Sequence, residues 1–412
     1  KLSYDYGLKV AKAIETEWFF QDRGHNRYDS NFNNFHKLRL YARGEQPIQK
    51  YKDELSINGD LSYLNLDWTP VPIIPKFVDI VVNGIADRAF EVKAHSQDDY
   101  GVAKRTEYME SILGDMATKD MNDFAAQEFG INLYQNDPET LPETQEELEL
   151  HMQLNYKQAV EIAEEQAINV LLEGNNYDLI KRQLYYDLTV LGIAAVKTEF
   201  TTSEGVTIKY VDPSNLVYSY TESPYFDDIY YVGEVKTIPI NELAKQFPHL
   251  SQEDLEEIQQ TGYSQRSNYN ETGPRYDDTD QNKVEVLYFN YKTFMNEVYK
   301  VKETGSGADK VIMKDDSFNP PEDAQGNFSK LERAIETLYE GAMILGTNKL
   351  LKWEMAENMM RSKSNFTKVK MNYNIVAPRM YKGKIQSLVN RITGFADMIQ
   401  LTHLKLQQVM SR

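Results

Sequence analysis

The stretch YVDPSNLVYSYTESPYFDDIYYVGEV, from Tyr210 to Val235, gives the clearest indication of the fold. It contains six tyrosines, and its two prolines divide it into short segments rich in aromatic and β-branched residues. Such residues favour strands, whereas proline, aspartate and serine favour the turns between strands. The pattern therefore predicts strands at LVYSY and DIYYVGEVKT, separated by the turn TESPYFD.

A strand pattern precedes this stretch, and a helix pattern follows it. GIAAVKTEFTTSEGVTIKYVD alternates as a β-hairpin does, with its turn at residues 203–205. PINELAKQF and LSQEDLEEIQ together predict a helix from Pro239 to about Thr261. The polar residues that follow, up to Asn282, predict a linker.

A second β-rich region follows the linker. KVEVLYFNYKTFMNEVYKVKE, which begins at Lys283, predicts two strands, and VIMKDDSF predicts a third, shorter one. A polar insertion separates these segments from ETLYEGAMILGTNKLLKWE. We therefore expect a compact β-rich module from residue 283 to about residue 378.

The first part of the chain has mainly helical patterns. PKFVDIVVNGIADRAFEV predicts a helix with Pro75 in its first turn, where the missing N–H of proline costs nothing. Five apolar residues lie on one face of this helix, and we expect them to be buried: Phe77, Val78, Val81, Val82 and Ile85. Further along, residues 136–150 contain six acids and no base, which predicts a solvated connecting loop.

The C-terminal segment has the most regular hydrophobic spacing. From Ile385 to Val409, apolar residues recur every three or four positions, which predicts one helix of about 27 residues, roughly 40 Å long. Thr402 is the exception, and Gly394 predicts a bend or a close contact with another helix. These apolar positions, which we call the seam, are Ile385, Leu388, Ile392, Phe395, Ile399, Leu406 and Val409.

Charge is distributed unevenly along the chain. The formal net charge is −18, which opposes nonspecific binding of a polyanion to the protein as a whole. Residues 361–412 nevertheless contain ten Lys or Arg and one acid, Asp397, whereas the preceding residues contain 35 basic and 62 acidic side chains. This asymmetry indicates either a polyanion facing the C-terminal segment or a basic helix that is salt-bridged to acidic neighbours.

The sequence contains no recognisable catalytic or metal-binding motif. It has no cysteine, and its six histidines do not recur at the spacing of a zinc site. The glycine-rich phosphate-binding loop of ATPases is absent, so we expect no ATPase activity and no cofactor. Asp227 and Asp228 are residues of the type that a glycosidase uses, but adjacent residues in a strand point to opposite faces, whereas a glycosidase needs facing carboxyl groups. No segment reaches the roughly 20 apolar residues that span a bilayer.

The order of these elements resembles that of the portal protein of tailed bacteriophages, the connector through which DNA enters and leaves the capsid. The stretch from Tyr210 to Val235, followed by INELAKQFP, is the run most similar to the family. The other similar segments are LRLYARGEQPIQKY, VPIIPKFVDIVVNGI, KVEVLYFNY and APRMYKGKIQSLVNRITGFADMIQLTHLKLQQVM. The abundance of Tyr and Asn and the acidic net charge resemble the portals of crAss-like gut phages in particular. The resemblance extends over nearly the whole chain and depends on the order of the elements more than on any single motif.

The resemblance implies an α+β portal fold that assembles into a ring of twelve subunits. Residues 1–238 would form the wing, residues 239–282 the descending stem helix with a linker, residues 283–378 the clip, and residues 379–412 the ascending stem helix. Portals continue beyond this helix into a tunnel loop, further wing and a crown. We therefore expect the sequence to be a fragment that lacks these parts.

The resemblance also implies partners and site residues. The partners would be the terminase motor, the major capsid protein, tail or head-completion proteins, and genomic double-stranded DNA that passes through without sequence-specific binding. The protein would be located in the virion, after assembly in the host bacterial cytoplasm. Lys384, Arg391 and Lys405 would approach the DNA phosphates, and the seam would pack against a helix of the neighbouring subunit or the other stem helix of the same subunit.

Two alternatives to a portal subunit remain open at the level of the sequence. The first is another structural protein of the virion, such as a scaffold or a tail adaptor. The second is a carbohydrate-active enzyme that uses Asp227 and Asp228.

Overall fold

The structure is a computed structural model, and the chain in it forms two compact units. One unit contains Lys1–Asp87 and Leu179–Arg412, and the other contains Arg88–Asp178. The described residues are 3–22, 31–56, 66–86, 90–154, 156–201, 205–259, 283–303, 309–315, 318–319, 328–357, 359–362 and 364–410. The predicted linker, residues 261–282, lies outside these ranges.

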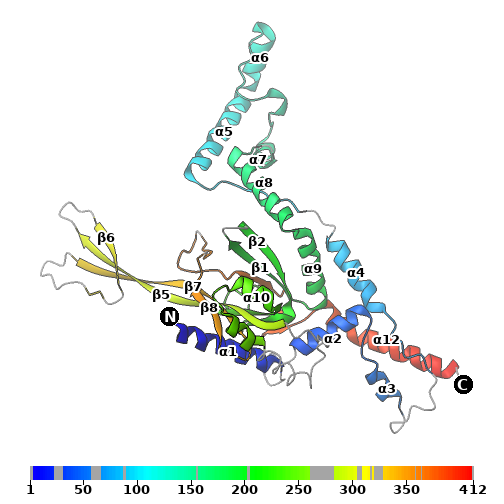
Figure 1. The fold of residues 1–412 in the computed structure, drawn as a ribbon. Helices are drawn as coiled ribbons and strands as arrows, with labels where there is room; N and C mark the ends of the chain where they lie inside the picture. Colours follow the sequence, from blue (N-terminus) through cyan, green and yellow to red (C-terminus); the bar gives the residue numbers. More distant parts are fainter. Residues whose placement is uncertain are drawn as a thin grey trace. The chain divides into compact units, whose positions relative to one another are not determined.

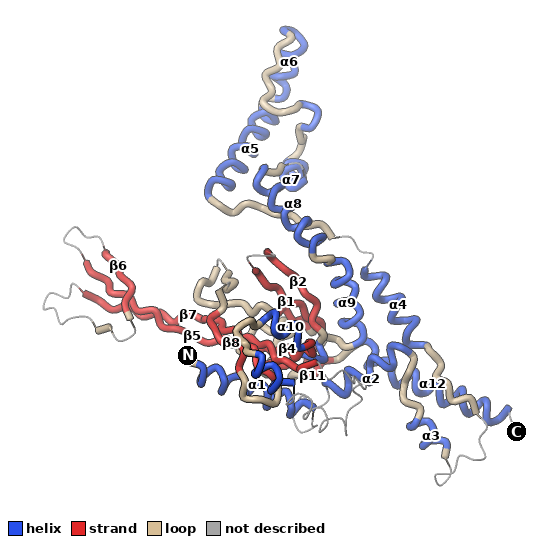
Figure 2. Tube along the Cα trace, in the orientation of Figure 1, coloured by secondary structure: helices blue, strands red, loops and turns tan. Residues whose placement is uncertain are grey.

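A six-stranded antiparallel sheet is the centre of the first unit (Figures 1 and 2). Five of its strands lie in the order β3-β4-β5-β7-β8, and β6 pairs with β5 off this path. The strands are β3 (Leu216–Tyr218), β4 (Tyr231–Pro239), β5 (Lys283–Glu303), β6 (Asp309–Lys314), β7 (Phe328–Ile344) and β8 (Leu350–Met355). The strands predicted at LVYSY, DIYYVGEVKT and VIMKDDSF are therefore confirmed.

Strand β5 differs from the prediction in two ways. It is one strand of 21 residues instead of two, because β7 pairs with it without a register shift from Val286 to Lys302. It also pairs with β4, from Tyr291 opposite Tyr231 to Lys283 opposite Pro239. The β-rich region that begins at residue 283 therefore shares its sheet with earlier strands and is not a compact unit of its own.

A second, three-stranded sheet has the order β2-β1-β9. Its strands are β1 (Ala194–Thr201), β2 (Gly205–Val211) and β9 (Tyr373–Val376). The pairing of β1 with β2 confirms the predicted hairpin, although residues 202–204 of its turn lie outside the described residues. Near the C-terminus, β10 (Met380–Tyr381) and β11 (Lys384–Ile385) form a small separate hairpin.

Helices cover both faces of the six-stranded sheet. The helices of the first unit are α1 (Tyr4–Asp22), α2 (Asn31–Arg43), α3 (Gln49–Leu55), α4 (Ile73–Ala86), α9 (Tyr177–Val190), α10 (Ile240–Gln246) and α12 (Leu388–Met410), with a further helical segment at residues 252–259. On one face, Ile14 and Trp18 of α1 pack in a cluster with Phe289. On the other face, Leu243 and Ile258 pack in a cluster with Val286.

The predicted stem helix from Pro239 to Thr261 is not continuous. Helix α10 ends at Gln246, and Phe247 has φ −126° and ψ 74°, outside the helical region. Pro248 explains this break, because the residue before a proline is disfavoured in the helical conformation. Both helical segments pack their apolar side chains on the sheet.

Helix α4 contains Pro75 in its first turn, as predicted, but buries only part of its apolar face. Val78 is buried, Val81 and Val82 are partly buried, and Phe77 and Ile85 are exposed. The burial expected of all five residues is therefore wrong for these two. Helix α4 instead packs through Ile74 and Val78 in a core shared with α2 and α12.

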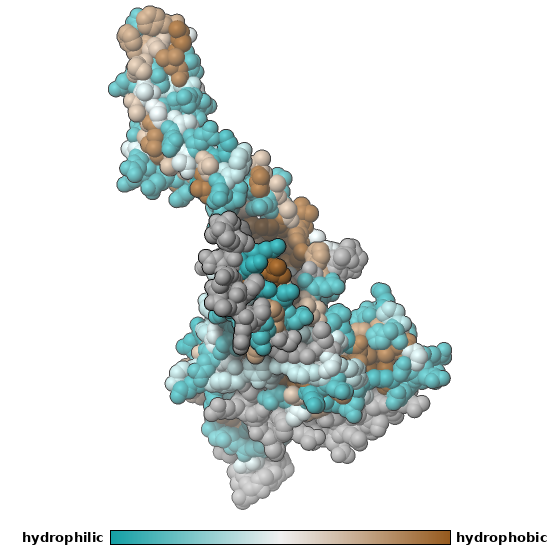
Figure 3. Space-filling model, turned by 90° about the vertical axis from the view of Figure 1, so that its left-hand side faces the viewer, coloured by the Kyte–Doolittle hydropathy of each residue, from teal (hydrophilic) through white to brown (hydrophobic). Residues whose placement is uncertain are grey.

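The second unit is almost entirely helical. Its helices are α5 (Asp99–Ala117), α6 (Lys119–Phe129), α7 (Gln145–Leu154) and α8 (Ala159–Gly174), with the short 3-10 turn η1 (Pro138–Thr140). The acidic segment predicted as a loop contains η1 and the start of α7, because Leu148 packs with Ile112 and Met152 in a small core. Apolar side chains are exposed around the α6 end of this unit (Figure 3): Met121, Phe124, Phe129, Ile131 and Leu133.

Candidate functional site

Helix α12 is shorter than the seam predicts. It contains 23 residues and begins at Leu388, so Lys384 and Ile385 lie in β11 instead. Lys382 and Gly383 have φ values of 49° and 73° and form the turn of the β10–β11 hairpin. The Ser387 side chain then accepts a hydrogen bond from the Asn390 N–H at 3.0 Å, which satisfies a donor at the start of the helix.

The buried face of α12 is not the seam. The residues of α12 that are buried are Val389, Ala396, Gln400 and Leu404. Gln400 is fully buried and fixes the segment before α4, because its Oε1 accepts from the Val71 N–H at 2.8 Å and its Nε2 donates to the Thr69 carbonyl at 3.3 Å. An alanine and a glutamine on this face explain why hydrophobic spacing did not identify it.

Asp397, the one acid in the basic C-terminal segment, also lies on the side of α12 that faces the neighbouring helices. It accepts hydrogen bonds from the hydroxyls of Tyr41 at 2.8 Å and Tyr51 at 2.7 Å, and its carboxylate lies 2.5 Å from Lys50 Nζ. Burial alone would raise the pKa of Asp397, but the hydrogen bonds from Lys50 and the two tyrosines lower it below its usual value. The acid therefore anchors α12 to α2 and α3.

The opposite face of α12 carries both the seam and two basic residues. Phe395, Ile399, Leu406 and Val409 are exposed, and Leu388 and Ile392 are only partly buried. Within the described residues, Ile385 and Ile392 pack against the core that α2 and α4 share, and the four exposed seam residues of α12 remain uncovered. Gly394 also lies on an open surface, since a Cβ there would meet nothing within 4 Å, so it makes no close helix contact in this part of the chain.

The three residues predicted to approach DNA are all exposed. Arg391 and Lys405 lie on the open face of α12, 14 positions apart, which corresponds to about 21 Å along the helix. Lys384 lies apart from them, on the hairpin before the helix. Across the described residues of the segment 361–410, no Lys or Arg forms an ion pair with a carboxylate. Salt-bridging to acidic neighbours therefore does not account for the basic charge of this segment.

A pocket of about 600 Å³ contains the two adjacent acids, Asp227 and Asp228. They lie in a turn before β4 and not in a strand. The prediction that they point to opposite faces of a strand is therefore wrong. Asp228 accepts a hydrogen bond from the Thr221 hydroxyl. Glu336, a third acid in the pocket lining, accepts from the Val369 N–H at 2.9 Å.

Three lysines share this pocket with the acids: Lys292, Lys368 and Lys370. Lys292 belongs to β5, and the other two belong to the segment before β9. No spacing in the sequence links these segments, so sequence reasoning missed the pocket. Its mixed charge suits a polar ligand, and its geometry alone does not define a reaction.

A partly buried cluster of charged and aromatic side chains lies between the two sheets. Lys197 of β1 forms an ion pair with Glu199 and lies 5.1 Å from the ring centre of Tyr373 on β9. It is also 5.9 Å from the ring centre of Tyr288 on β5. Burial raises the pKa of Glu199, but Lys197 and Lys209 together outweigh this effect and bring it down to about 2. This cluster joins the sheets and is structural.

Tyr210 belongs to a second buried cluster. Its hydroxyl donates to Asp187 at 2.5 Å, and Arg39 lies 3.7 Å from Asp187 and 2.7 Å from Asp212. Burial raises the pKa of Asp187 to about 6, although the Tyr210 hydrogen bond and the Arg39 charge lower it. The tyrosine therefore joins β2 to α9.

Comparison with models of known protein families and with curated proteins finds no match. Within the described ranges, no group of three or more histidine, aspartate or glutamate side chains is arranged to hold a metal ion. No helix in the described part of the chain is both long and apolar enough to cross a membrane.

Proposed function

We propose that the chain is a portal subunit that forms, with further copies of itself, the DNA channel at a capsid vertex of a tailed bacteriophage. The observation that supports this most directly is the division of α12. One face is fixed in the core by Val389, Gln400 and Asp397, while the opposite face presents apolar residues and uncompensated basic charge to solvent.

The exposed seam supports assembly into a ring. Contiguous exposed apolar residues on a soluble protein mark an interaction surface, and in a cyclic oligomer each subunit offers a different surface to each neighbour. In this proposal a neighbouring copy covers Phe395, Ile399 and Leu406. Assembly into a ring would thus bury an apolar surface that is exposed in the single chain.

The distribution of charge suits DNA that must slide. A strong continuous ring of Lys and Arg would retain the duplex through counterion release, whereas a few basic rings in an acidic protein hold it weakly. Lys384, Arg391 and Lys405 supply such rings once they are repeated around an axis. The terminase, the major capsid protein and the tail or head-completion proteins are the further proposed partners, and the virion is the proposed location.

Sedimentation velocity on variants of α12 tests this assignment. We expect the parent chain to form ring-sized oligomers and the double variant Ile399→Asp with Leu406→Asp to sediment as a monomer, because a carboxylate cannot be buried in an apolar interface. Phe366→Asp, at an exposed phenylalanine outside α12, is the matched control and should assemble normally. Assembly of the α12 variant at the parent concentration would contradict the proposal.

The pocket around Asp227 favours one other candidate, a carbohydrate-active enzyme. A glycan-hydrolysis screen with the parent, Asp227→Asn and Asp228→Asn separates the two functions. We expect no hydrolysis by any of the three proteins, together with no ATPase activity. Hydrolysis by the parent that either substitution abolishes would favour the enzyme.

A further inference from the structure

The end of the second unit is a hook made of helix α6 and residues 130–136, which we call the tip. The chain reverses at Gly130, whose φ of 64° lies in the left-handed region that favours glycine. Tyr134 then lies back along the helix, because its hydroxyl donates to the Lys119 carbonyl at 3.2 Å and to the Asp123 carboxylate at 2.7 Å. These contacts give the tip a defined shape.

Polar side chains form the interior of the tip. Asp115, on α5 next to the tip, is buried and accepts hydrogen bonds from the N–H groups of Gln135 and Asn136 at 3.2 and 2.9 Å. Asn122 is the buried residue of α6, and its Nδ2 donates to Thr118 Oγ1 at 3.0 Å. Polar contacts thus hold this part of the chain together.

The large apolar side chains of the tip are exposed (Figure 3). Met121, Phe124 and Phe129 of α6 are each more than half exposed, and so are Ile131 and Leu133 of the returning segment. The two phenylalanine rings contact each other edge to face, with their centres 6.3 Å apart. Polar residues inside and apolar residues outside are the reverse of an ordinary fold. A contiguous exposed apolar surface of this kind marks an interaction site.

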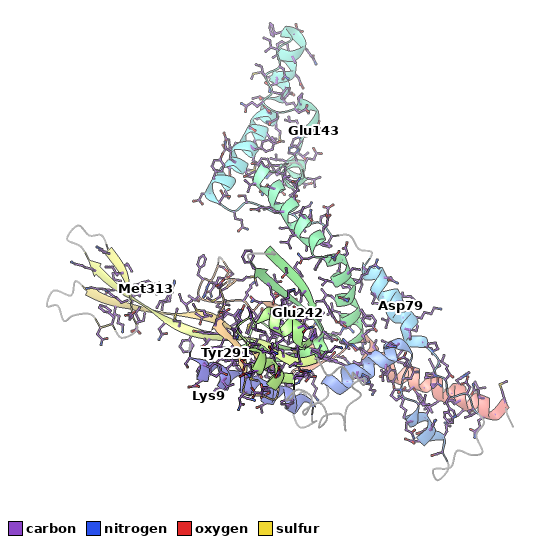
Figure 4. The ribbon with its side chains drawn as sticks, viewed as in Figure 1. Lys9, Asp79, Glu143, Glu242, Tyr291 and Met313 are labelled. Carbon is purple, nitrogen blue, oxygen red and sulfur yellow. The ribbon has the colours of Figure 1, made fainter. Side chains whose placement is uncertain are left out.

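The tip and the segment after it are strongly acidic. Residues 115–150 contain ten acids and one base, Lys119. Lys119 forms an ion pair with Glu143 at 2.9 Å, and Figure 4 labels Glu143 on the segment before α7. The one positive charge of this region is therefore already paired within the unit.

Two of these acids border the apolar surface directly. Asp120 precedes Phe124 by four positions and Glu128 follows it by four, so the three side chains lie along one face of α6. Both acids are exposed, and neither forms an ion pair within the part of the chain that the structure describes. A carboxylate is thus available one helical turn away on each side of an exposed phenylalanine.

This distribution of charge selects the kind of molecule that covers the tip. A second copy of the tip would bring like charges together, which opposes association. The phosphates of a nucleic acid or of an anionic lipid surface would be repelled in the same way. A molecule that complements the tip combines positive charge with an apolar face of its own.

We propose that the tip is a docking surface for a basic amphipathic helix of a partner protein. Such a helix presents apolar anchors at positions i, i+3, i+4 and i+7, and lysines or arginines beside these anchors would pair with Asp120 and Glu128. The flexible side chain of Met121 is of the type that adapts to a bound helix. The proposal goes beyond the portal function, because it depends on the second unit and not on α12 or on a ring.

Fluorescence anisotropy of a labelled synthetic peptide tests the proposal on the full chain. The peptide is a designed helix of about 18 residues with leucine anchors bordered by lysines. We expect Phe124→Ala with Phe129→Ala to weaken its binding at least about tenfold, because a few central anchors carry most of the energy of an interface. The matched control is Phe77→Ala with Phe366→Ala, at two exposed phenylalanines of the first unit, and it should bind the peptide as the parent does.

A second pair of variants tests the role of charge. Asp120→Asn with Glu128→Gln should weaken binding about threefold at about 50 mM salt, and this difference should disappear at about 500 mM salt, where charges are screened. Glu54→Gln with Asp79→Asn removes the same charge from exposed acids of the first unit and should leave the affinity unchanged. A peptide with the same lysines but with serine in place of leucine should not bind.

The outcomes separate this inference from the portal function. Ile399→Asp with Leu406→Asp should abolish ring assembly and leave peptide binding unchanged, whereas loss of peptide binding in that variant would place the docking site on α12 and overturn the inference. Equal binding by the parent and the Phe124 variant, or no binding by the parent at about 50 mM salt, would also overturn it. Tighter binding of a peptide with the sequence of residues 388–410 would overturn the partner protein and assign the tip to a second copy. Circular dichroism should show the parent helix content in every variant.

Discussion

Strand β5 runs through two different environments. Its two parts show that the neighbouring elements determine which of its side chains are buried. From Val286 to Tyr291 it has strand partners on both sides and helices on both faces. From Phe294 to Glu303 its partners are β6 and β7 alone, in an outer part of the sheet that we call the arm, and Phe294 and Met295 are exposed there. Residue types alternate in both parts, so the covering elements, and not the strand itself, determine burial.

A lysine of the second sheet and a lysine of the arm differ in their surroundings. In the second sheet, Lys197 of β1 is partly buried beside Glu199 and the ring of Tyr373. In the arm, Lys302 lies directly opposite Lys310. A charge that is largely removed from water needs a partner within the fold, whereas Lys302 and Lys310 are exposed to solvent.

The largest expected effect compares two phenylalanines of the same strand. Phe289 is 1% exposed in the sheet body, and Phe294 is 57% exposed in the arm. We expect Phe289→Ala to lower the free energy of unfolding by about 4 kcal/mol through loss of burial and creation of a cavity. Phe294→Ala should change it by less than about 0.5 kcal/mol. Chemical denaturation measures both, and equal losses would remove the distinction between the two regions.

The next effect compares two lysines. Lys197→Met should destabilise the protein by about 2 to 3 kcal/mol, because it leaves Glu199 partly buried with Lys209 as its remaining partner. Lys302→Met should leave the unfolding free energy within about 0.5 kcal/mol of the parent. The pKa of Glu199, held at about 2, should rise in Lys197→Met. In the parent, the ion pairs of Glu199 stabilise the fold above the usual carboxyl pKa, and this stabilisation is lost as the pH falls toward 2. In Lys197→Met, this pH-dependent part of the unfolding free energy should be smaller.

The smallest effect is a pH dependence from Asp187. Its folded-state pKa of about 6 is above its usual value of 3.8, so the folded state binds more protons between these values. Stability from this group is full at low pH and is lost as the pH rises through 6. Between pH 4.5 and 7.5, the contribution of Asp187 to the free energy of unfolding should fall by on the order of 2 kcal/mol. Asp187→Asn keeps an acceptor for Tyr210 and should remove that part of the slope in denaturation curves measured across this range, while an unchanged slope would exclude Asp187 as its source.

The sequence predicted those parts of the fold in which local pattern and tertiary environment agree. The β1–β2 hairpin, β3, β4 and the start of α4 were all found from alternation, turn residues or Pro75. The unbroken length of β5 was missed, because continuous pairing with β7 is a tertiary property. The helix expected from Pro239 was broken at Phe247, where the effect of Pro248 was overlooked.

The candidate site was predictable in part. Spacing identified six of the seven seam residues as one face of a helix, but not that four of them stay exposed while Gln400 and Asp397 face inward. Asp397 was visible as the one acid in a basic segment, and its tyrosine partners come from distant helices.

The portal assignment is tested most directly by negative-stain electron microscopy of the full chain at micromolar concentration, viewed along the symmetry axis of any assembly. Our account predicts closed rings with a central channel and twelve subunits, the number that the resemblance to portals implies. A homogeneous population of monomers, or open filaments in place of closed rings, would contradict it.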